Sequence, residues 1–256
     1  MDIRVISIGT LGANPLWDER DPVRTGHATT TLIRADDAAI IVDPGLPSPA
    51  LKARLSERAG IGPEAITHVF LTSFSPECRR GIELFPEARW LISEHEREAV
   101  GVPLAQSLAR LAQSKQSAED AGETAHEDEQ TMMRIVERDV ALLQKTEPSP
   151  DSIAQGVDLF PLPGMSPGMC GVLIAEPDTT TLVCGDAVPT IEHMEKGQIL
   201  KGAHDREKAL ESFKEALEIA DILIPGRDNL TPNRVRGAMA PDPSSRQAPG
   251  SPTQMP

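Results

Sequence analysis

Residues 67–78, THVFLTSFSPEC, join an apolar strand pattern to an abrupt run of small polar residues. The β-branched and aromatic residues of the first half predict a buried strand over residues 67–72. The second half, from Ser73 to Cys78, follows that strand as a loop with two hydroxyl groups, a carboxylate and a thiol. Because functional groups are often carried on loops held by a rigid scaffold, this stretch indicates both a core strand and candidate site residues.

Similar strand patterns recur along the chain. The predicted strands cover residues 3–8, 29–33, 39–42, 67–72, 89–92, 157–162, 171–175, 180–183 and 222–224. A helix is predicted over residues 48–60, where Ser48 and Pro49 are a typical start and Gly60 is a typical end. Another is predicted around residues 210–217, where apolar residues form one stripe. Strands that alternate with helices in this way indicate an α/β fold.

Four further strand ends carry short motifs with glycine, proline or acidic residues. In chain order they are Asp43-Pro44-Gly45, Pro163-Gly164-Met165-Ser166-Pro167-Gly168, Cys184-Gly185-Asp186 and Pro225-Gly226-Arg227-Asp228-Asn229. With residues 71–78, they resemble the ordered motifs of the metallo-β-lactamase superfamily: Asp-x-Gly, Thr-His-x-His-x-Asp-His, Pro-Gly-His, Gly-Asp and Pro-Gly-His. The resemblance covers about residues 1–230, and five motifs in the right order are specific although each alone is weak.

The resemblance implies an αββα sandwich, in which two mixed β-sheets pack face to face and helices cover the outer faces. It also implies that the five motif loops meet at one edge of the sandwich, with Asp43 supporting the pocket there. In the family, paired metal ions at this edge are held by histidines and carboxylates and activate a water molecule. We therefore expect one metallo-β-lactamase-like domain over residues 1–234.

The metal-binding positions depart from the family pattern. Matched motif by motif, they are Ser73, Ser75, Glu77, Cys78, Met165, Asp186 and Arg227. Only Asp186 is unchanged. Hydroxyl groups and a thioether are poor ligands for a hard or borderline divalent ion. The resemblance therefore points to a degenerate metal site, and we expect no metal cofactor.

An alternative places one zinc or iron ion on Glu77, Cys78 and Asp186, which together supply oxygen and sulfur donors. Against it, the guanidinium of Arg227 brings a permanent positive charge to the same place. We predict that Arg227 bridges Asp186 and Glu77 in place of a metal, because two carboxylates in a partly buried space need a cation.

Cys78 and His193 are weaker catalytic candidates. Cys78 precedes Arg79 and Arg80, whose charges favour a thiolate if their side chains turn toward it. The simpler interpretation is that Cys78 fills the volume of a lost imidazole. His193 follows Asp186 by seven residues, in a stretch that in the family leads away from the site, so we expect it to point toward the pocket mouth. All six histidines of the chain miss the metal-binding positions.

Two segments fall outside the alternating pattern. Residues 103–147 contain two helical stretches, and we predict a helical insertion packed near the pocket, where it narrows access. Residues 235–256 are rich in proline and small polar residues and have no apolar period, so a disordered tail is predicted.

The composition limits the classes of partner. A formal net charge of −14 repels polyanions, so nucleic acid is not expected as a partner. No apolar stretch has the length of a membrane span or a signal sequence, which favours a cytoplasmic protein with no membrane partner. The three cysteines lack C-x-x-C spacing, so reduced thiols are expected.

Three interpretations of function follow from these observations. The leading one is a non-catalytic pseudo-hydrolase that retains a pocket for a small molecule or a protein partner. The first alternative is a metal-dependent hydrolase of the ester, thioester or lactone class with an atypical single-ion site. The second alternative is a thiol-dependent activity at Cys78.

Overall fold

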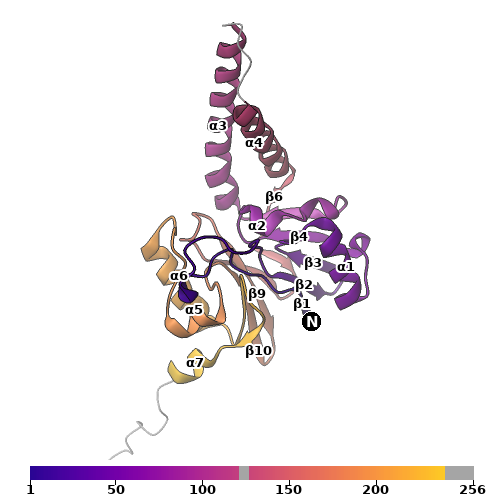
Figure 1. Cartoon of the computed structure of the whole chain (residues 1–256). Helices are drawn as coiled ribbons and strands as arrows, with labels where there is room; N and C mark the ends of the chain where they lie inside the picture. The colour runs from indigo at the N-terminus through magenta and orange to yellow at the C-terminus, as the bar shows by residue number, and fades with distance from the viewer. Residues whose placement is uncertain (121–126, 240–256) are drawn as a thin grey trace, which may run out of the picture.

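The computed structural model describes residues 1–120 and 127–239, and these form two stacked β-sheets with helices on both outer faces (Figure 1). The strand order is β1-β2-β3-β4-β5-β6 in one sheet and β12-β11-β10-β9-β8-β7 in the other. Both sheets are mixed. In the first, β3 to β6 pair in parallel, and in the second β10 and β11 do.

The strands are short and lie close to their predicted positions. Those of the first sheet are β1 (Asp2–Ser7), β2 (Thr30–Ala35), β3 (Ala38–Val42), β4 (His68–Leu71), β5 (Arg89–Ile92) and β6 (Glu147–Pro148). Those of the second sheet are β7 (Ser152–Ala154), β8 (Val157–Pro161), β9 (Cys170–Glu176), β10 (Thr179–Gly185), β11 (Ile222–Pro225) and β12 (Thr231–Pro232). The predicted strands are confirmed to within two residues at each end, whereas β6, β7 and β12 are too short to leave a sequence pattern.

Helices connect and cover these strands. They are α1 (Ser48–Ala59), α2 (Pro76–Arg79), α3 (Glu94–Asp120), α4 (Glu127–Lys145), α5 (Ile191–Lys196), α6 (Arg206–Ile219) and α7 (Arg234–Met239), with 3-10 turns at η1 (Pro15–Trp17), η2 (Pro63–Ala65) and η3 (Ile82–Leu84). Within the described ranges, no helix is long and apolar enough to cross a membrane.

The core has the layers of an αββα sandwich. Alternate residues of each strand face opposite sides. Ile40, Val42 and Phe70 pack between the sheets against residues such as Val183 and Ile224. Neighbouring residues face outward: Ile41 and Val69 pack under α1, and Leu182 and Leu223 pack under α6. The predicted fold class and the αββα arrangement are therefore confirmed.

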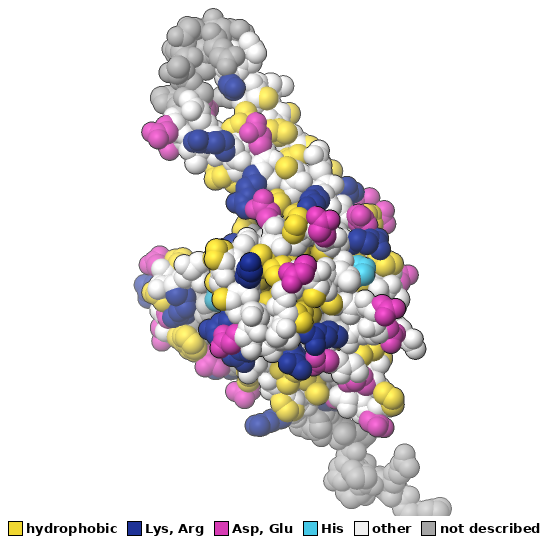
Figure 2. Space-filling model, turned by 90° about the vertical axis from the view of Figure 1, so that its right-hand side faces the viewer, with side chains coloured by type: hydrophobic (Ala, Val, Ile, Leu, Met, Phe, Trp, Pro, Cys, Tyr) yellow, Lys and Arg dark blue, Asp and Glu magenta, His cyan; other side chains and the backbone are white. Residues whose placement is uncertain are grey.

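Helices α3 and α4 form an antiparallel pair that rises from the domain (Figure 1 and Figure 2). The prediction that the helical segment begins at residue 103 was wrong, because α3 begins at Glu94 and continues through Pro103. A proline is favoured in the first turn of a helix and unfavourable inside one, which made Pro103 resemble a helix start. Val100 and Leu104, on either side of it, pack against the core, and these contacts favour one continuous helix.

The predicted disordered tail begins too early. Residues 235–239 belong to α7, where Val235 packs against the second sheet and Arg236 contacts Asp221 at 2.6 Å. These contacts with the domain stabilise a helix that the sequence, which has no apolar period here, does not predict. The rest of the predicted tail, residues 240–256, lies outside the described residues.

Candidate functional site

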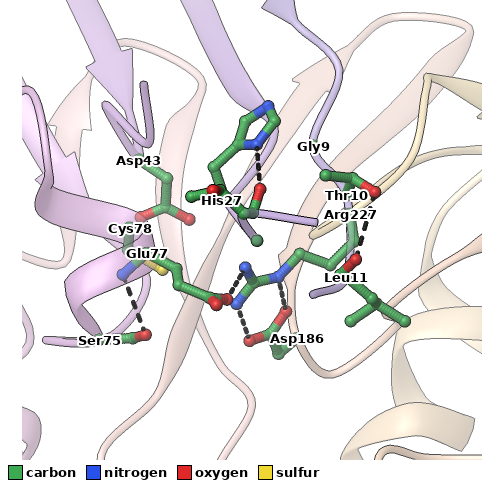
Figure 3. Close-up of polar contacts among 12 residues, drawn as sticks. Gly9, Thr10, Leu11, His27, Asp43, Ser75, Glu77, Cys78, Asp186 and Arg227 are labelled. Carbon is green, nitrogen blue, oxygen red and sulfur yellow. Dashed lines mark hydrogen bonds and ion pairs between the residues drawn. The ribbon is translucent and has the colours of Figure 1, made fainter. Parts of the chain in front are cut away.

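Loops at one edge of the sandwich bring the predicted site residues together (Figure 3). Asp43 follows β3, residues 72–78 follow β4, Asp186 follows β10 and Arg227 follows β11. Hydrogen bonds and ion pairs join these four loops. The remaining motif, residues 163–168, contributes to a cavity beside them. The expected convergence of the five motifs is therefore present.

Asp43 joins the ends of β3 and β4. Its backbone has a left-handed φ of 49°, which is uncommon for a residue other than glycine. The buried carboxylate accepts hydrogen bonds from the Thr72 backbone nitrogen at 2.9 Å and from Thr72 Oγ1 at 2.6 Å. Burial raises the pKa of Asp43 from 3.8 to about 7. Asp43 thus anchors the start of the loop that carries Ser73 to Cys78.

Arg227 lies between two carboxylates, as predicted. Its Nε and Nη2 donate to the two oxygens of Asp186 at 2.7 Å each, and its Nη1 donates to Glu77 Oε2. The Arg227 side chain is 3% exposed, against 16% for Asp186 and 36% for Glu77. Although burial opposes the charged form, the Asp186 carboxylate outweighs it and raises the pKa of Arg227 above its ordinary value. The pair is therefore a two-pronged, largely buried salt bridge.

The approach of Arg227 to Asp186 depends on a glycine. A Cβ atom on Gly226 would lie 2.6 Å from the Gly185 carbonyl oxygen and 2.8 Å from Asp186 Oδ1. Both distances are too short for a carbon atom at either oxygen. The loops after β10 and β11 can therefore pack this closely only because position 226 has no side chain.

Ser73, Ser75 and Cys78 form the turn after β4. Ser75 caps the short helix α2 by accepting from the Glu77 backbone nitrogen at 3.3 Å. Ser73 Oγ lies 3.6 Å from Cys78 Sγ, and Thr72 Oγ1 lies 3.9 Å from the same sulfur. These hydroxyls thus have local structural partners around the thiol.

The environment of Cys78 does not favour a thiolate. The residue is 3% exposed, and burial followed by the nearby Asp43 carboxylate raises the pKa of its thiol well above the ordinary value. The two arginines expected to activate it have other partners: Arg79 Nη2 lies 2.8 Å from Asp139, and Arg80 donates to the Gly26 carbonyl oxygen at 3.1 Å. A reactive Cys78 was expected only if the Arg79 and Arg80 side chains turned toward the thiol, and they contact other groups instead.

His193 is not placed at the pocket mouth. It lies in α5, is 2% exposed, and its Nδ1 is 2.8 Å from Thr190 Oγ1. Burial lowers the pKa of His193, which favours the neutral imidazole. The expectation that His193 faces the pocket was wrong, because α5 turns the side chain into the domain.

The site residues do not fit the metal centre that the resemblance implies. Of the proposed donor trio, Glu77 and Asp186 contact the Arg227 guanidinium and Cys78 carries a thiol that is difficult to ionise. A permanent cation between two carboxylates opposes a second cation at the same place. In the described part of the chain, no three His, Cys, Asp or Glu side chains are grouped so that they could hold a metal ion. The donor set therefore fits neither the paired nor the single-ion site.

A cavity of about 410 Å³ opens beside this salt bridge. The loop after β4 and Asp186 form one side, and the bases of α3 and α4 form another. Its lining residues from the predicted site are Ser73, Ser75, Met165 and Asp186. Its volume lies within the range of small-molecule sites.

Glu96 is a cavity residue that the sequence interpretation missed. Its buried carboxylate accepts from the Phe74 nitrogen at 3.0 Å and from the Gly168 nitrogen at 3.1 Å, so it joins two of the motif loops to α3. Ser93 Oγ accepts from the Glu96 nitrogen at 3.1 Å. The spacing Ser-x-x-Glu is typical of a helix start and was a usable signal for both Glu96 and the true beginning of α3.

Arg79 and Asp139 form a second missed contact. Arg79 also donates from Nε to the Phe74 carbonyl oxygen at 3.0 Å and stacks its guanidinium 4.3 Å from the Phe74 ring centre. Asp139 lies on α4, far along the chain, and no local pattern marks such a pairing. Together with Glu96, this salt bridge joins the base of the helical pair to the loop after β4.

The comparisons with known proteins agree with this architecture. Solved structures of similar fold include a putative metallo-beta-lactamase from Thermotoga maritima (TM-score 0.59, 18% identity, 90% of this chain and 98% of that one). Others are AidC, a dizinc quorum-quenching lactonase (TM-score 0.56, 18% identity, 74% and 67%), and AiiA from B. thuringiensis with N-decanoyl-L-homoserine bound at its active site (TM-score 0.56, 17% identity, 88% and 92%).

At these identities the structural likeness shows the fold alone. No curated protein sequence matches the chain. The sequence pattern of one family, the metallo-beta-lactamase superfamily, matches residues 23–226, which is most of the sandwich. The chain therefore belongs to the metallo-beta-lactamase superfamily.

Proposed function

We propose that this chain is a non-catalytic pseudo-hydrolase, which binds a small molecule without a metal cofactor in the cavity beside Ser73. The observation that carries the proposal is the position of Arg227, whose guanidinium lies between Asp186 and Glu77. In the family pattern these positions belong to the metal centre. A guanidinium neutralises the carboxylates, but it has no empty orbital to accept a lone pair of water, so it cannot act as the Lewis acid that lowers the pKa of a bound water molecule.

The cavity supports a binding role in place of hydrolysis. It has a volume of about 410 Å³, and its walls combine apolar side chains with polar groups. That mixture is typical of small-molecule sites. We expect the partner to be a small molecule rather than a nucleic acid or a membrane, and the setting to be the cytoplasm, as the net charge of −14 and the lack of long apolar stretches favour.

The metal-dependent alternative requires a different arrangement of the same residues. An ion on Glu77, Cys78 and Asp186 would have to displace Arg227 from two carboxylates and remove the proton of a buried thiol. Proteins of similar fold include a dizinc lactonase. Hydrolysis of ester, thioester and lactone substrates therefore tests this alternative. The thiol-dependent alternative needs an ionised Cys78, which its surroundings oppose.

The test is metal analysis combined with hydrolysis assays. The full chain is purified without chelator, its zinc and iron are measured by inductively coupled plasma mass spectrometry, and ester, thioester and lactone hydrolysis is followed with and without added zinc. We expect far less than one ion per chain and no turnover above background. Stoichiometric metal with turnover that a chelator abolishes would overturn the proposal.

A restored variant provides the matched control. It carries the family residues at every altered position: Ser73→His, Ser75→His, Glu77→Asp, Cys78→His, Met165→His and Arg227→His. If this variant folds, as circular dichroism reports, we expect it to retain zinc under the same purification. If the variant takes up metal and the natural chain does not, the difference comes from the residues at the ligand positions and not from loss of metal during purification.

A further inference from the structure

The pair of helices α3 and α4 buries little of its own apolar surface. Beyond its base the pair projects away from the sandwich, so each helix has the other as its main neighbour (Figure 1). From residue 97 to residue 117, a stretch of α3 that the structure describes throughout, no residue is buried, and Leu104, Leu108 and Leu111 are only half-buried. Most of the stability of a helix in a protein comes from packing its apolar face against other elements. The pair is therefore an incomplete helical core.

Helix α3 also carries a second apolar stripe besides these leucines. It consists of Val102, Ala105, Ala109 and Ala112, whose spacing of i, i+3, i+7 and i+10 places them on one face of the helix. All four are exposed, and Val102 is 59% exposed. In a helix bundle each helix packs against two neighbours, and two apolar stripes on one helix are typical of that arrangement. The second stripe thus predicts a helical partner besides α4.

A groove of about 440 Å³ runs beside this second stripe. The three alanines of the stripe line it from α3, and Val140, Leu143 and Gln144 line it from α4. None of its described lining residues is charged, although 25% of the residues of the chain are. Alanine side chains are short, so the backbone of another helix can approach closely. The groove therefore fits an apolar helix better than a charged ligand.

We infer that this groove is an interface between two copies of the chain, whose helical pairs pack face to face as a four-helix bundle. Two copies supply the four helices that close such a bundle around one core. A two-fold axis brings the same surface of each copy together, so the second stripe of one copy packs against the groove of the other. With the two pairs antiparallel, the sandwiches lie at opposite ends of the bundle.

The length of the helical pair is sufficient for a stable dimer. From Gly101 to its end α3 is about 28 Å long, and two neighbouring helices are about 20 Å wide. Packing over this face buries on the order of 1,100 Å² in the two copies together, above the roughly 1,000 Å² that a specific interface needs. Leu104 lines both this groove and the cavity beside Ser73, so a second copy would also stabilise one wall of that cavity.

Sedimentation equilibrium of the full natural chain tests whether the dimer forms. The measurement covers chain concentrations from about 1 to about 200 µM, because dimerisation follows mass action. We expect the mean mass to rise with concentration and to level off at twice the mass of one chain. A single-chain mass at every concentration would overturn the inference without any variant.

Charged substitutions in the groove test the surface. Ala105→Glu combined with Ala109→Glu should raise the dissociation constant of the dimer at least about 100-fold, because the new carboxylates would be desolvated and face their own copies. Both alanines are exposed in the single chain, so its circular dichroism spectrum should be unchanged. The matched control, Gln106→Glu with Ser117→Glu, adds two charges at exposed positions of α3 that do not line the groove. Equal effects of the two pairs would overturn the inference.

Ile135→Glu tests a different apolar surface of the same helical pair. Met132 and Ile135 on α4 are each 51% exposed but do not line the groove. The substitution should leave the dissociation constant unchanged to within about twofold, since surface changes outside an interface have small effects. If Ile135→Glu separates the copies and the alanine variant does not, the dimer forms through this other surface and the inference is wrong.

Salt dependence tests the apolar character of the interface. Each copy has a formal net charge of −14, so the two copies repel each other, and salt screens that repulsion. Raising sodium chloride from about 50 to about 300 mM should therefore lower the dissociation constant by at least about twofold. A dimer that salt weakens would depend on ion pairs, which the groove does not offer, and would contradict the proposed surface.

Discussion

Asp186 and Arg227 form a salt bridge in which two nitrogens of the arginine each lie 2.7 Å from a different oxygen of the aspartate. The two residues follow β10 and β11, which pair in parallel, so their loops leave the same edge of the sheet side by side. A side chain that is always protonated thus provides, from within the chain, the positive charge that carboxylates at this edge require.

Arg227→Ala should destabilise the fold. It would leave Asp186 largely buried and without its counter-charge, a change that costs about 3–5 kcal/mol for a buried ion pair. We expect a loss near the lower end, about 3 kcal/mol, since Glu77 is partly exposed and can be hydrated. Urea denaturation followed by circular dichroism measures the free energy of unfolding.

Arg236→Ala is the matched control for that loss. It breaks the exposed pair between Arg236 and Asp221, whose side chains are 42% and 46% exposed. Such surface pairs contribute about 0–1 kcal/mol. If the free energy of unfolding falls by the same amount in both variants, the Arg227 salt bridge stabilises the fold no more than an exposed ion pair does.

Arg227→His should not create a zinc site. The variant restores one imidazole and removes the competing charge, but Ser73, Ser75 and Met165 still offer no good ligand for zinc. Titration against a chromophoric chelator should give no tight binding, whereas the sixfold restored variant should compete for the metal. A stoichiometric zinc complex of the single variant would show that the remaining carboxylates and thiol are sufficient.

Much of the fold could be predicted from local sequence patterns. The β-branched strands and the helix over residues 48–59 appear close to where their residues predict them, since burial on alternate faces dictates these patterns. The start of α3 was missed because Pro103 outweighed the Ser-x-x-Glu spacing from Ser93 to Glu96. Strands of two or three residues, such as β6 and β12, depend on their neighbours in the sheet and have no local pattern.

The site was predictable where a motif places its residues. Asp43, Asp186 and Arg227 meet as expected because each follows a strand of the sandwich. The orientation of His193 and the partner of Arg79 were not predictable, since they depend on how α5 and α4 pack in three dimensions. Contacts between distant segments require the structure.

Cys78 should resist alkylation in the folded protein. Its thiol is buried, and its pKa is raised well above the ordinary value, so little thiolate is available to iodoacetamide near neutral pH. Cys170 and Cys184 are also buried, and burial raises the pKa of each. Mass spectrometry should show slow modification of the native chain and rapid modification of all three cysteines in urea. Fast and selective labelling of native Cys78 would revive the thiol-dependent alternative.

Asp43 should make the stability depend on pH. Burial raises its pKa from 3.8 to about 7 in the folded protein. Below the unfolded value the carboxyl is protonated in both states, so its contribution to stability is fully present. Between the two values the unfolded chain releases the proton and the folded chain keeps it. The free energy of unfolding should therefore fall as pH rises through this interval, by at most about 1.4 kcal/mol per pH unit.

Asp43→Asn isolates this contribution. The amide has no proton to release and is close in shape to the protonated carboxyl that Thr72 contacts. Its free energy of unfolding should therefore decline less steeply than that of the natural chain between about pH 4 and pH 7. Urea denaturation at a series of pH values in one buffer mixture gives both curves. If the two curves run parallel over this interval, Asp43 is already ionised in the folded protein, and the hydrogen bonds from Thr72 outweigh its burial.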